Sequence, residues 1–230
     1  MKSNNEWMSI SDMMSGLMLI FMFIAISFMI QVQSDKDKMK EIAITYNKDK
    51  QELNSDLHSE FDEDLIKWKA VITRDNSIVF NSPSVLFGIG KSRIKRQFKN
   101  ILNDFFPRYI NILYSKKYKN EIEEIRIEGH TSKSWKNSLS QDEIYLKNMQ
   151  LSQYRANHVL SYCYQINNPI INLSKKWLEQ HFRANGMAFA KLKYLDKKRT
   201  IPDNIKSRRV EFKVEMKTEE KIYKILKASE

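Results

Sequence analysis

The residue with the clearest chemical potential is Asp12, a carboxylate at the start of an apolar stretch. The twenty residues Met13–Val32 carry no charge. As a helix with a rise of about 1.5 Å per residue they would reach about 30 Å, the thickness of the hydrocarbon core of a bilayer. An ionisable side chain in such a segment is costly and usually marks an ion pathway. The chemistry open to Asp12 is therefore the passage of an ion.

Two interpretations of Asp12 are open. In the first, it is the N-cap of the membrane helix, after Ser9 and Ser11, in the headgroup region where a charge costs little. In the second, the helix begins near Trp7, an interfacial anchor, which places Asp12 about 7 Å deeper. Ser11 and Ser15 are four residues apart, and small residues at this spacing let another helix approach closely. The Asp12 face therefore suits a partner helix better than lipid.

The apolar stretch predicts an uncleaved membrane anchor. It is longer than the core of a typical signal peptide, the segment 2–6 before it is hardly basic, and no small-x-small cleavage site follows it. Lys36, Lys38 and Lys40 follow the stretch, whereas only Lys2 precedes it. Counted by lysine and arginine alone, these flanks favour a cytoplasmic C-terminal side.

The composition argues against an enzyme and against nucleic-acid binding. Lys and Arg outnumber Asp and Glu by 39 to 28, for a net charge of +11, but the basic groups are scattered without a recognition motif. The single cysteine, Cys163, excludes an intrachain disulfide and is expected to be a buried, inert thiol. The four histidines lie in unrelated contexts and no nucleophile elbow or P-loop is present. We expect no metal site and no cofactor beyond a transported ion.

The hydropathy pattern divides the chain into four parts: a tail and membrane helix (1–33), a charged and partly amphipathic helical linker (34–75), a folded domain (76–216) and a C-terminal helical tail (217–230). An apolar stripe follows the linker at helical spacing. We expect this stripe to pack on the folded domain or on a second copy of the chain. It consists of Leu53, Leu57, Phe61, Leu65, Trp68 and Ile72.

The folded domain is predicted to be an α/β sandwich. Alternating or β-rich segments at 76–80, 124–129, 182–186 and 209–215 predict strands, the last of them at an edge of the sheet. Apolar residues at helical spacing predict a helix from Ile94 that bends or ends at Pro107, a second helix at 145–164, and a short helix at 177–182. Strands that alternate with helices are typical of this fold class.

Two parts of the chain resemble known families. The C-terminal region resembles the OmpA-like peptidoglycan-binding domain in four motifs that occur in order, namely Val85–Gly90 (VLFGIG), Ile127–Thr131 (IEGHT), Asn148–Ala156 (NMQLSQYRA) and Ser207–Phe212 (SRRVEF). The N-terminal segment Trp7–Met18 (WMSISDMMSGLM) resembles the single span of MotB-type stator subunits. Within that architecture the span is most similar to the ZorB family, the B subunits of Zorya anti-phage defence systems.

The resemblance implies an ion-driven stator subunit. Two such chains would sit inside a ring of five MotA-like or ZorA-like subunits, with the N-terminus in the cytoplasm and the folded domain in the periplasm of the inner membrane, against the orientation favoured by the flanking lysines. Asp12 would bind and release a proton or a sodium ion, and Ser15 would contribute a hydroxyl. Alternatives are a flagellar MotB-like stator subunit and a non-conducting tether to peptidoglycan.

The resemblance also implies a set of peptidoglycan-binding residues, namely Thr131, Ser132, Asn148, Leu151 and Arg155. Diaminopimelate, the stem residue that these domains hold, carries carboxylate and ammonium groups, so a receptor needs a guanidinium beside an acid. Arg155 matches the family's arginine, but Ser132 replaces its aspartate, and either Asp142 or Glu143 could substitute for it. A structural ion pair for Arg155, and capping or packing for Asn148 and Leu151, are the alternative roles.

Overall fold

The computed structural model describes the backbone of residues 3–135 and 140–217, and the side chains in these ranges except those of residues 3–9, 42, 43, 45 and 46. The helical tail expected at 217–230 lies outside the described residues apart from Lys217. The described chain divides into two compact units, with the boundary between Lys48 and Asp49.

The N-terminal unit is the first part of helix α1 (Ser3–Trp68). One stretch of it, Ile10–Glu41, is long and apolar enough to cross a membrane. Its large apolar side chains are exposed in the single chain, for example Phe28 and Met29. Such a surface is stable in lipid or against other helices. Because α1 already begins at Ser3, Asp12 lies inside the helix and is not its N-cap.

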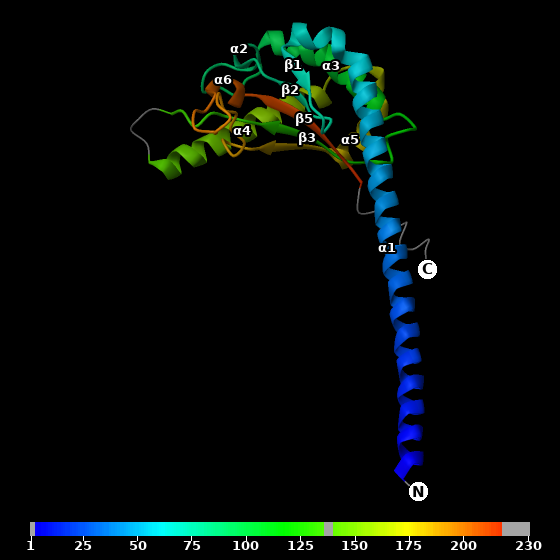
Figure 1. The fold of residues 1–230 in the computed structure, drawn as a ribbon. Helices are drawn as coiled ribbons and strands as arrows, with labels where there is room; N and C mark the ends of the chain where they lie inside the picture. The colour runs from blue at the N-terminus through cyan, green and yellow to red at the C-terminus, as the bar shows by residue number, and fades with distance from the viewer. Residues whose placement is uncertain (1–2, 136–139, 218–230) are drawn as a thin grey trace. The chain divides into compact units, whose positions relative to one another are not determined.

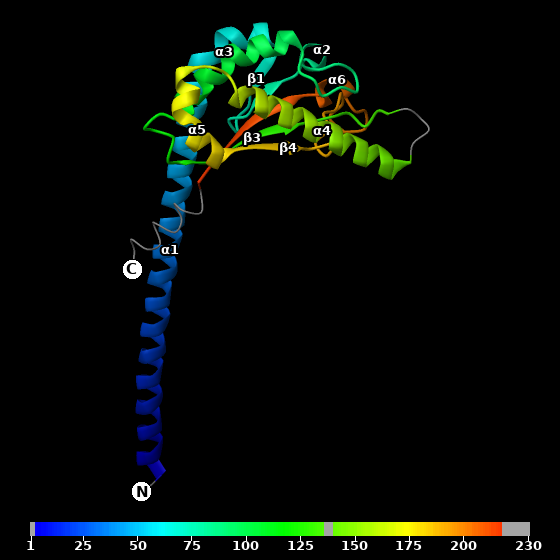
Figure 2. The same cartoon turned by 180° about the vertical axis from the view of Figure 1, so that it is seen from behind.

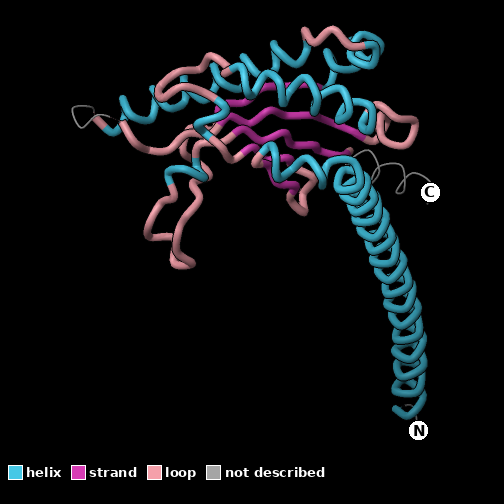
Figure 3. The backbone as a smooth tube through the Cα atoms, turned by 90° about the horizontal axis from the view of Figure 1, so that it is seen from above, coloured by secondary structure: helices cyan, strands magenta, loops and turns pink. Residues whose placement is uncertain are grey.

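The second unit, residues 49–217, is built on one five-stranded sheet with the order β1-β2-β5-β3-β4 (Figures 1 and 3). Neighbouring strands are antiparallel except β3 and β4, which are parallel. The strands are β1 (Ala70–Ile72), β2 (Ile78–Phe80), β3 (Ile122–Gly129), β4 (Phe182–Gly186) and β5 (Val210–Met216). The expectation of β5 at an edge is wrong, because it lies at the centre, paired with β2 on one side and β3 on the other.

Helices pack on this sheet and confirm the predicted α/β sandwich. They are α2 (Pro83–Leu86), α3 (Arg96–Leu113), α4 (Gln141–Tyr164), α5 (Pro169–His181) and α6 (Asn204–Ser207). Helix α3 continues through Pro107. Helix α4 begins earlier than expected, because Ser140 and Glu143 form a reciprocal capping box. Figure 2 shows α4 beside β3 and β4. The chain runs from β3 through α4 and α5 to β4, and this crossover makes the two strands parallel neighbours.

The boundary predicted between linker and domain at residue 76 differs from the structure, because the compact unit begins at Asp49. Leu53, Leu57 and Phe61 of the apolar stripe are fully buried within the single chain, as expected for packing on the domain. The predicted helix does not continue to Ile72. It ends at Trp68, since Lys69 adopts a left-handed conformation (φ 51°), and the next residues form strand β1.

An aromatic cluster and an arginine hold the end of α1 against α3. The ring of Phe105 lies 5.4 Å from Phe61, and within 5.3 Å of rings on β2 and β5. Arg108 donates to Glu60 at 2.7 Å and to Asp64 at 2.8 Å, with its guanidinium 5.0 Å from the ring of Phe61. Aromatic contacts and charged hydrogen bonds of this kind add to the apolar burial. Residues 49–68 are therefore part of the domain core.

Two glycines allow α4 to approach the sheet closely. A Cβ atom on Gly129, the last residue of β3, would lie 2.3 Å from the carbonyl oxygen of Ser152. A Cβ atom on Gly186, the last residue of β4, would lie 2.6 Å from the backbone nitrogen of Gln153. Neither contact can be relieved by a side-chain rotation, since both involve helix backbone. Only glycine fits these two positions at the observed spacing.

We predict that Gly129→Ala lowers the free energy of unfolding by about 1–3 kcal/mol, the usual cost of an overpacked site. The measurement is thermal or denaturant unfolding of the detergent-solubilised chain. Gly88→Ala is the matched control, because the nearest atom to its new Cβ would be the flexible Lys91 Cδ at 3.3 Å. Equal stability of the Gly129→Ala variant and the parent would contradict the steric explanation.

Candidate functional site

The five residues predicted to bind peptidoglycan line one pocket of about 780 Å³ in the second unit: Thr131, Ser132, Asn148, Leu151 and Arg155. The first two follow strand β3, and the other three lie on α4, which the glycine contacts hold beside that strand. The remaining wall comes from α2 and the segment that follows it, from the loop after β3, and from the region of α6. Residues far apart in the sequence thus converge on one cavity.

Arg155 is the central cation of this pocket. Its side chain is buried, and it donates from Nε to the carbonyl oxygen of Lys91 at 3.0 Å and from an Nη atom to that of Gly88 at 3.4 Å. Its guanidinium lies 4.9 Å from the centre of the Phe87 ring. Burial and the nearby positive charge of Arg208 lower the pKa of Arg155 to about 10. Among the described residues, Arg155 contacts no carboxylate. The structure therefore does not show the ion pair that was the alternative role of Arg155.

Three further cations that the sequence analysis did not select line the same pocket: Lys95, Arg208 and Arg209. Lys95 Nζ donates to the carbonyl oxygen of Ser84 at 2.6 Å, and Arg208 Nε donates to that of Asn204 at 2.9 Å. Of these, Arg209 is paired with Glu211. No Asp or Glu is among the described residues that line the pocket. The cavity therefore presents a strongly positive wall to a ligand.

Ser132 and its neighbours supply neutral polar groups. Thr131 and Ser132 are buried, and Thr131 Oγ1 has no hydrogen-bond partner among the described residues. The same is true of Trp135 Nε1 on the adjacent loop. The Glu143 carboxylate accepts a hydrogen bond from the Ser140 backbone nitrogen in the cap of α4. The structure thus places neither Glu143 nor Asp142 in the wall of the pocket.

Asn148 and Leu151 form part of the α4 wall. The Asn148 amide donates to the carbonyl oxygen of Ile144 at 2.9 Å, one helical turn earlier, so it does not cap the helix. Leu151 is half-buried and contributes apolar surface. Both side chains therefore shape the pocket while they also serve the local helix packing.

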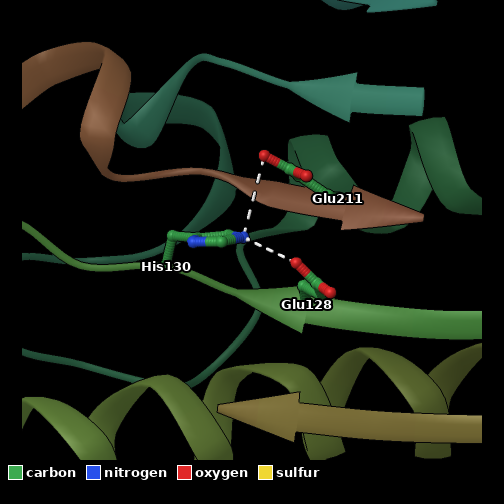
Figure 4. A group of neighbouring side chains, drawn as sticks. All are labelled: Glu128, His130 and Glu211. Atoms are coloured by element: carbon green, nitrogen blue, oxygen red, sulfur yellow. Dashed lines mark ion pairs between the residues drawn. The ribbon is translucent and has the colours of Figure 1, made fainter. Parts of the chain in front are cut away.

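Glu128, His130 and Glu211 form a polar cluster at the edge of the pocket (Figure 4). His130 Nε2 lies 3.4 Å from a Glu128 oxygen and 3.7 Å from a Glu211 oxygen. Among the described residues, this is the group of His and acidic side chains with a geometry that could hold a metal ion. Its carboxylates are already neutralised, since Lys191 lies 3.2 Å from Glu128 and Arg209 contacts Glu211. The cluster is therefore a polar network, in which Lys191 and Arg209 balance the charges of the two carboxylates.

Protonation in this cluster is set by burial and by the ion pairs. Burial by itself would raise the pKa of Glu128, but hydrogen bonds from His130 and Lys191 outweigh it and lower this pKa to about 2. Burial lowers the pKa of His130, although the two carboxylates oppose this. At neutral pH the cluster therefore holds an ionised Glu128 beside a neutral imidazole.

Asp12 and Ser15 lie in the other unit, on α1. The Ser15 hydroxyl donates to the carbonyl oxygen of Ser11 at 2.8 Å, so its proton is used within the helix and its oxygen lone pairs remain able to accept. Asp12 is exposed in the single chain. The pair offers a carboxylate and a hydroxyl oxygen on an apolar helix, a ligand set suited to a proton or a small hard cation.

Comparison with solved structures finds related architectures of low sequence identity. The cell wall anchor of the type VI secretion system from Pseudomonas aeruginosa is 15% identical, with a TM-score of 0.45 over 70% of this chain and 97% of that one. A putative MotB-like protein from Desulfovibrio vulgaris is 18% identical, with a TM-score of 0.43 over 73% of this chain and 96% of that one. No family model matches the chain.

The chain thus combines an apolar N-terminal helix, long enough to cross a membrane and with an internal carboxylate, and an α/β sandwich that carries a cationic pocket. The Zorya protein ZorB of Escherichia coli (strain Crooks) is 42% identical over 226 residues, which are 98% of this chain and 94% of that protein. The chain belongs to the ZorB family.

We predict that the domain loses stability as the pH falls below about 6.5, the ordinary pKa of histidine. Because burial lowers the pKa of His130, the unfolded chain takes up this proton before the folded one does, so acid favours unfolding. The Glu128 contribution persists in this range, since it is lost only as the pH falls from about 4.5 toward 2. Unfolding curves of the detergent-solubilised chain between about pH 7.5 and 5.5 measure the effect.

The matched variants are His130→Gln, which cannot take up the proton, and His158→Gln on the exposed face of α4. The first is expected to flatten the pH dependence in this range, and the second to leave it as in the parent. A parent stability that does not fall between these pH values would contradict a buried neutral His130.

Proposed function

We propose that this chain is an ion-driven stator subunit of the bacterial inner membrane, anchored to peptidoglycan and acting in a Zorya-type anti-phage defence system. What carries the proposal is the combination, in one chain of the ZorB family, of a carboxylate inside an apolar helix and a cationic pocket on a folded domain. The helix would supply the ion pathway, and the pocket would supply the fixed point.

The ion pathway of the proposal centres on Asp12. The start of α1 at Ser3 supports it, because a carboxylate inside a helix cannot serve as its cap. In the membrane, Asp12 would face a MotA-like or ZorA-like subunit and alternate between an ion-bound and an ion-free state, with the Ser15 oxygen as a second ligand. In this proposal two copies of the chain sit in a ring of five partner subunits, with the N-terminus cytoplasmic and the domain periplasmic.

The anchor of the proposal is the pocket around Arg155. A buried guanidinium without a carboxylate partner is costly, so a ligand carboxylate that completes the pair gains both charge and hydrogen bonds. Peptide stems of the cell wall carry such carboxylates. The chain would bind this ligand without a cofactor and without catalysis, and would transmit force between wall and membrane.

We predict that Asp12→Asn abolishes phage protection while the complex still assembles, because the amide has nearly the same shape but cannot bind and release the ion. Asp35→Asn, an exposed carboxylate after the apolar stretch, is the matched control and should protect cells as the parent does. Plaque counts report activity and co-purification of the partner subunit reports assembly. Full protection by Asp12→Asn would eliminate the ion pathway and leave a tether.

We predict that Arg155→Ala weakens binding of the detergent-solubilised chain to purified sacculi by about 10- to 100-fold, the equivalent of one charged hydrogen-bond pair. Arg93→Ala, an exposed arginine outside the pocket, is the matched control. Co-sedimentation at a series of sacculus concentrations measures the effect. Retention of Arg155→Ala equal to that of the parent would remove the anchor from the proposal.

A further inference from the structure

The charges of the pocket are one-sided. Lys95, Arg155 and Arg208 line it, each of them donates a hydrogen bond to a backbone carbonyl oxygen, and no acid is among the described residues that line the pocket. Carbonyl oxygens orient a cation but do not neutralise its charge. A carboxylate would be attracted to this wall, and an ammonium group would be repelled by it.

The side of the pocket that Ser132 lines is neutral. The Ser132 hydroxyl carries no charge, and no acid is among the described residues that line the cavity. The two acids closest in sequence, Asp142 and Glu143, are in the first turn of α4 and do not line the pocket. A ligand ammonium would therefore lose its hydration in this cavity without gaining an ion pair.

The neutral residues on this side of the pocket favour an uncharged ligand group. Thr131, Ser132 and Trp135 line it, and none of them carries a charge. An amide is uncharged, so its burial beside these residues costs less than the burial of an ammonium group. Acylation of a ligand amine also removes the positive charge that the cationic wall would repel.

We propose that the pocket preferentially binds diaminopimelate of the wall stem when its second amine is acylated, as it is in a peptide cross-link. Stems in which this amine is a free ammonium group would bind less well. The inference rests on the proposed anchoring function and specifies its ligand. Arg155 and Arg208 hold the carboxylate, while Thr131 and Trp135 accommodate the amide. The chain would then anchor on cross-linked wall, the part of the polymer that carries load.

The test compares two probes on the detergent-solubilised full chain by calorimetry. Both are synthetic stem tripeptides that end in diaminopimelate with free carboxylates. In one the second amine is free, and in the other it is acetylated. We expect the acetylated probe to bind more tightly than the free-amine probe, and the Arg155→Ala chain to lose both.

Two substitutions at the same position separate charge from shape. Ser132→Asp is expected to reverse the preference, so that the free-amine probe binds about tenfold or more tightly than the acetylated one, as a charged hydrogen bond would give. Ser132→Asn is similar in size but neutral, and should keep the preference of the parent.

The outcomes distinguish the two proposals. If the parent binds the free-amine probe as tightly as the acetylated probe or more tightly, the inference is overturned while wall anchoring stands. If the parent binds neither probe and is not retained on sacculi, the anchoring function itself fails. Tighter binding of the acetylated probe, with reversal only in Ser132→Asp, supports the inference.

Discussion

The close contact of α4 with the ends of β3 and β4 is the constraint on which the rest of the domain depends. Gly129 and Gly186 let the helix backbone lie directly against the two parallel strands. This spacing fixes the distance between the loop that follows β3 and the helix that carries Arg155, and with it the size of the pocket. The Ser152 hydroxyl strengthens the junction by accepting from the Ala188 backbone nitrogen at 2.9 Å. The recognition surface is therefore set by backbone packing rather than by flexible side chains.

Charge is distributed differently in the sheet and in the pocket. On β3 and β5, acidic and basic residues are paired within and across strands, as Arg126 is with Glu124 and Glu128 of β3 and with Glu215 of β5. In the pocket, Arg155, Lys95 and Arg208 are oriented by carbonyl oxygens and contact no acid among the described residues, whereas Arg209 is paired with Glu211. Paired charges hold the strands together and nearly cancel each other's electrostatic potential. The unpaired cations of the pocket are not neutralised, so they still attract a negatively charged ligand. The same residue types thus serve structure in one place and binding in another.

Local patterns in the sequence were sufficient for most elements but not for their arrangement. Alternation identified β3 and β5. Two of the four motifs contain Thr131, Asn148, Leu151 and Arg155, and Ser132 directly follows one of them, so these motifs identified the five predicted pocket residues. Strand β1 was missed because Ile72 continues the helical spacing of the stripe, and only the left-handed Lys69 breaks it. The full length of α5 was missed although Asn168 and Pro169 form a recognisable helix start. The central place of β5, and the convergence of Lys95 and Arg208 on Arg155, depend on long-range pairing that no local pattern encodes.

The burial of residues 49–68 decides where the domain can be cut. A fragment that starts at residue 76 would lack Leu53, Leu57, Phe61 and strand β1, so it would expose the aromatic rings of α3 to water and leave β2 as an open edge. Such a fragment is prone to aggregate, and its failure to bind would say nothing about the pocket. Chimaeras that exchange this domain between stators should therefore be joined before Asp49, inside the charged helix and not at its end.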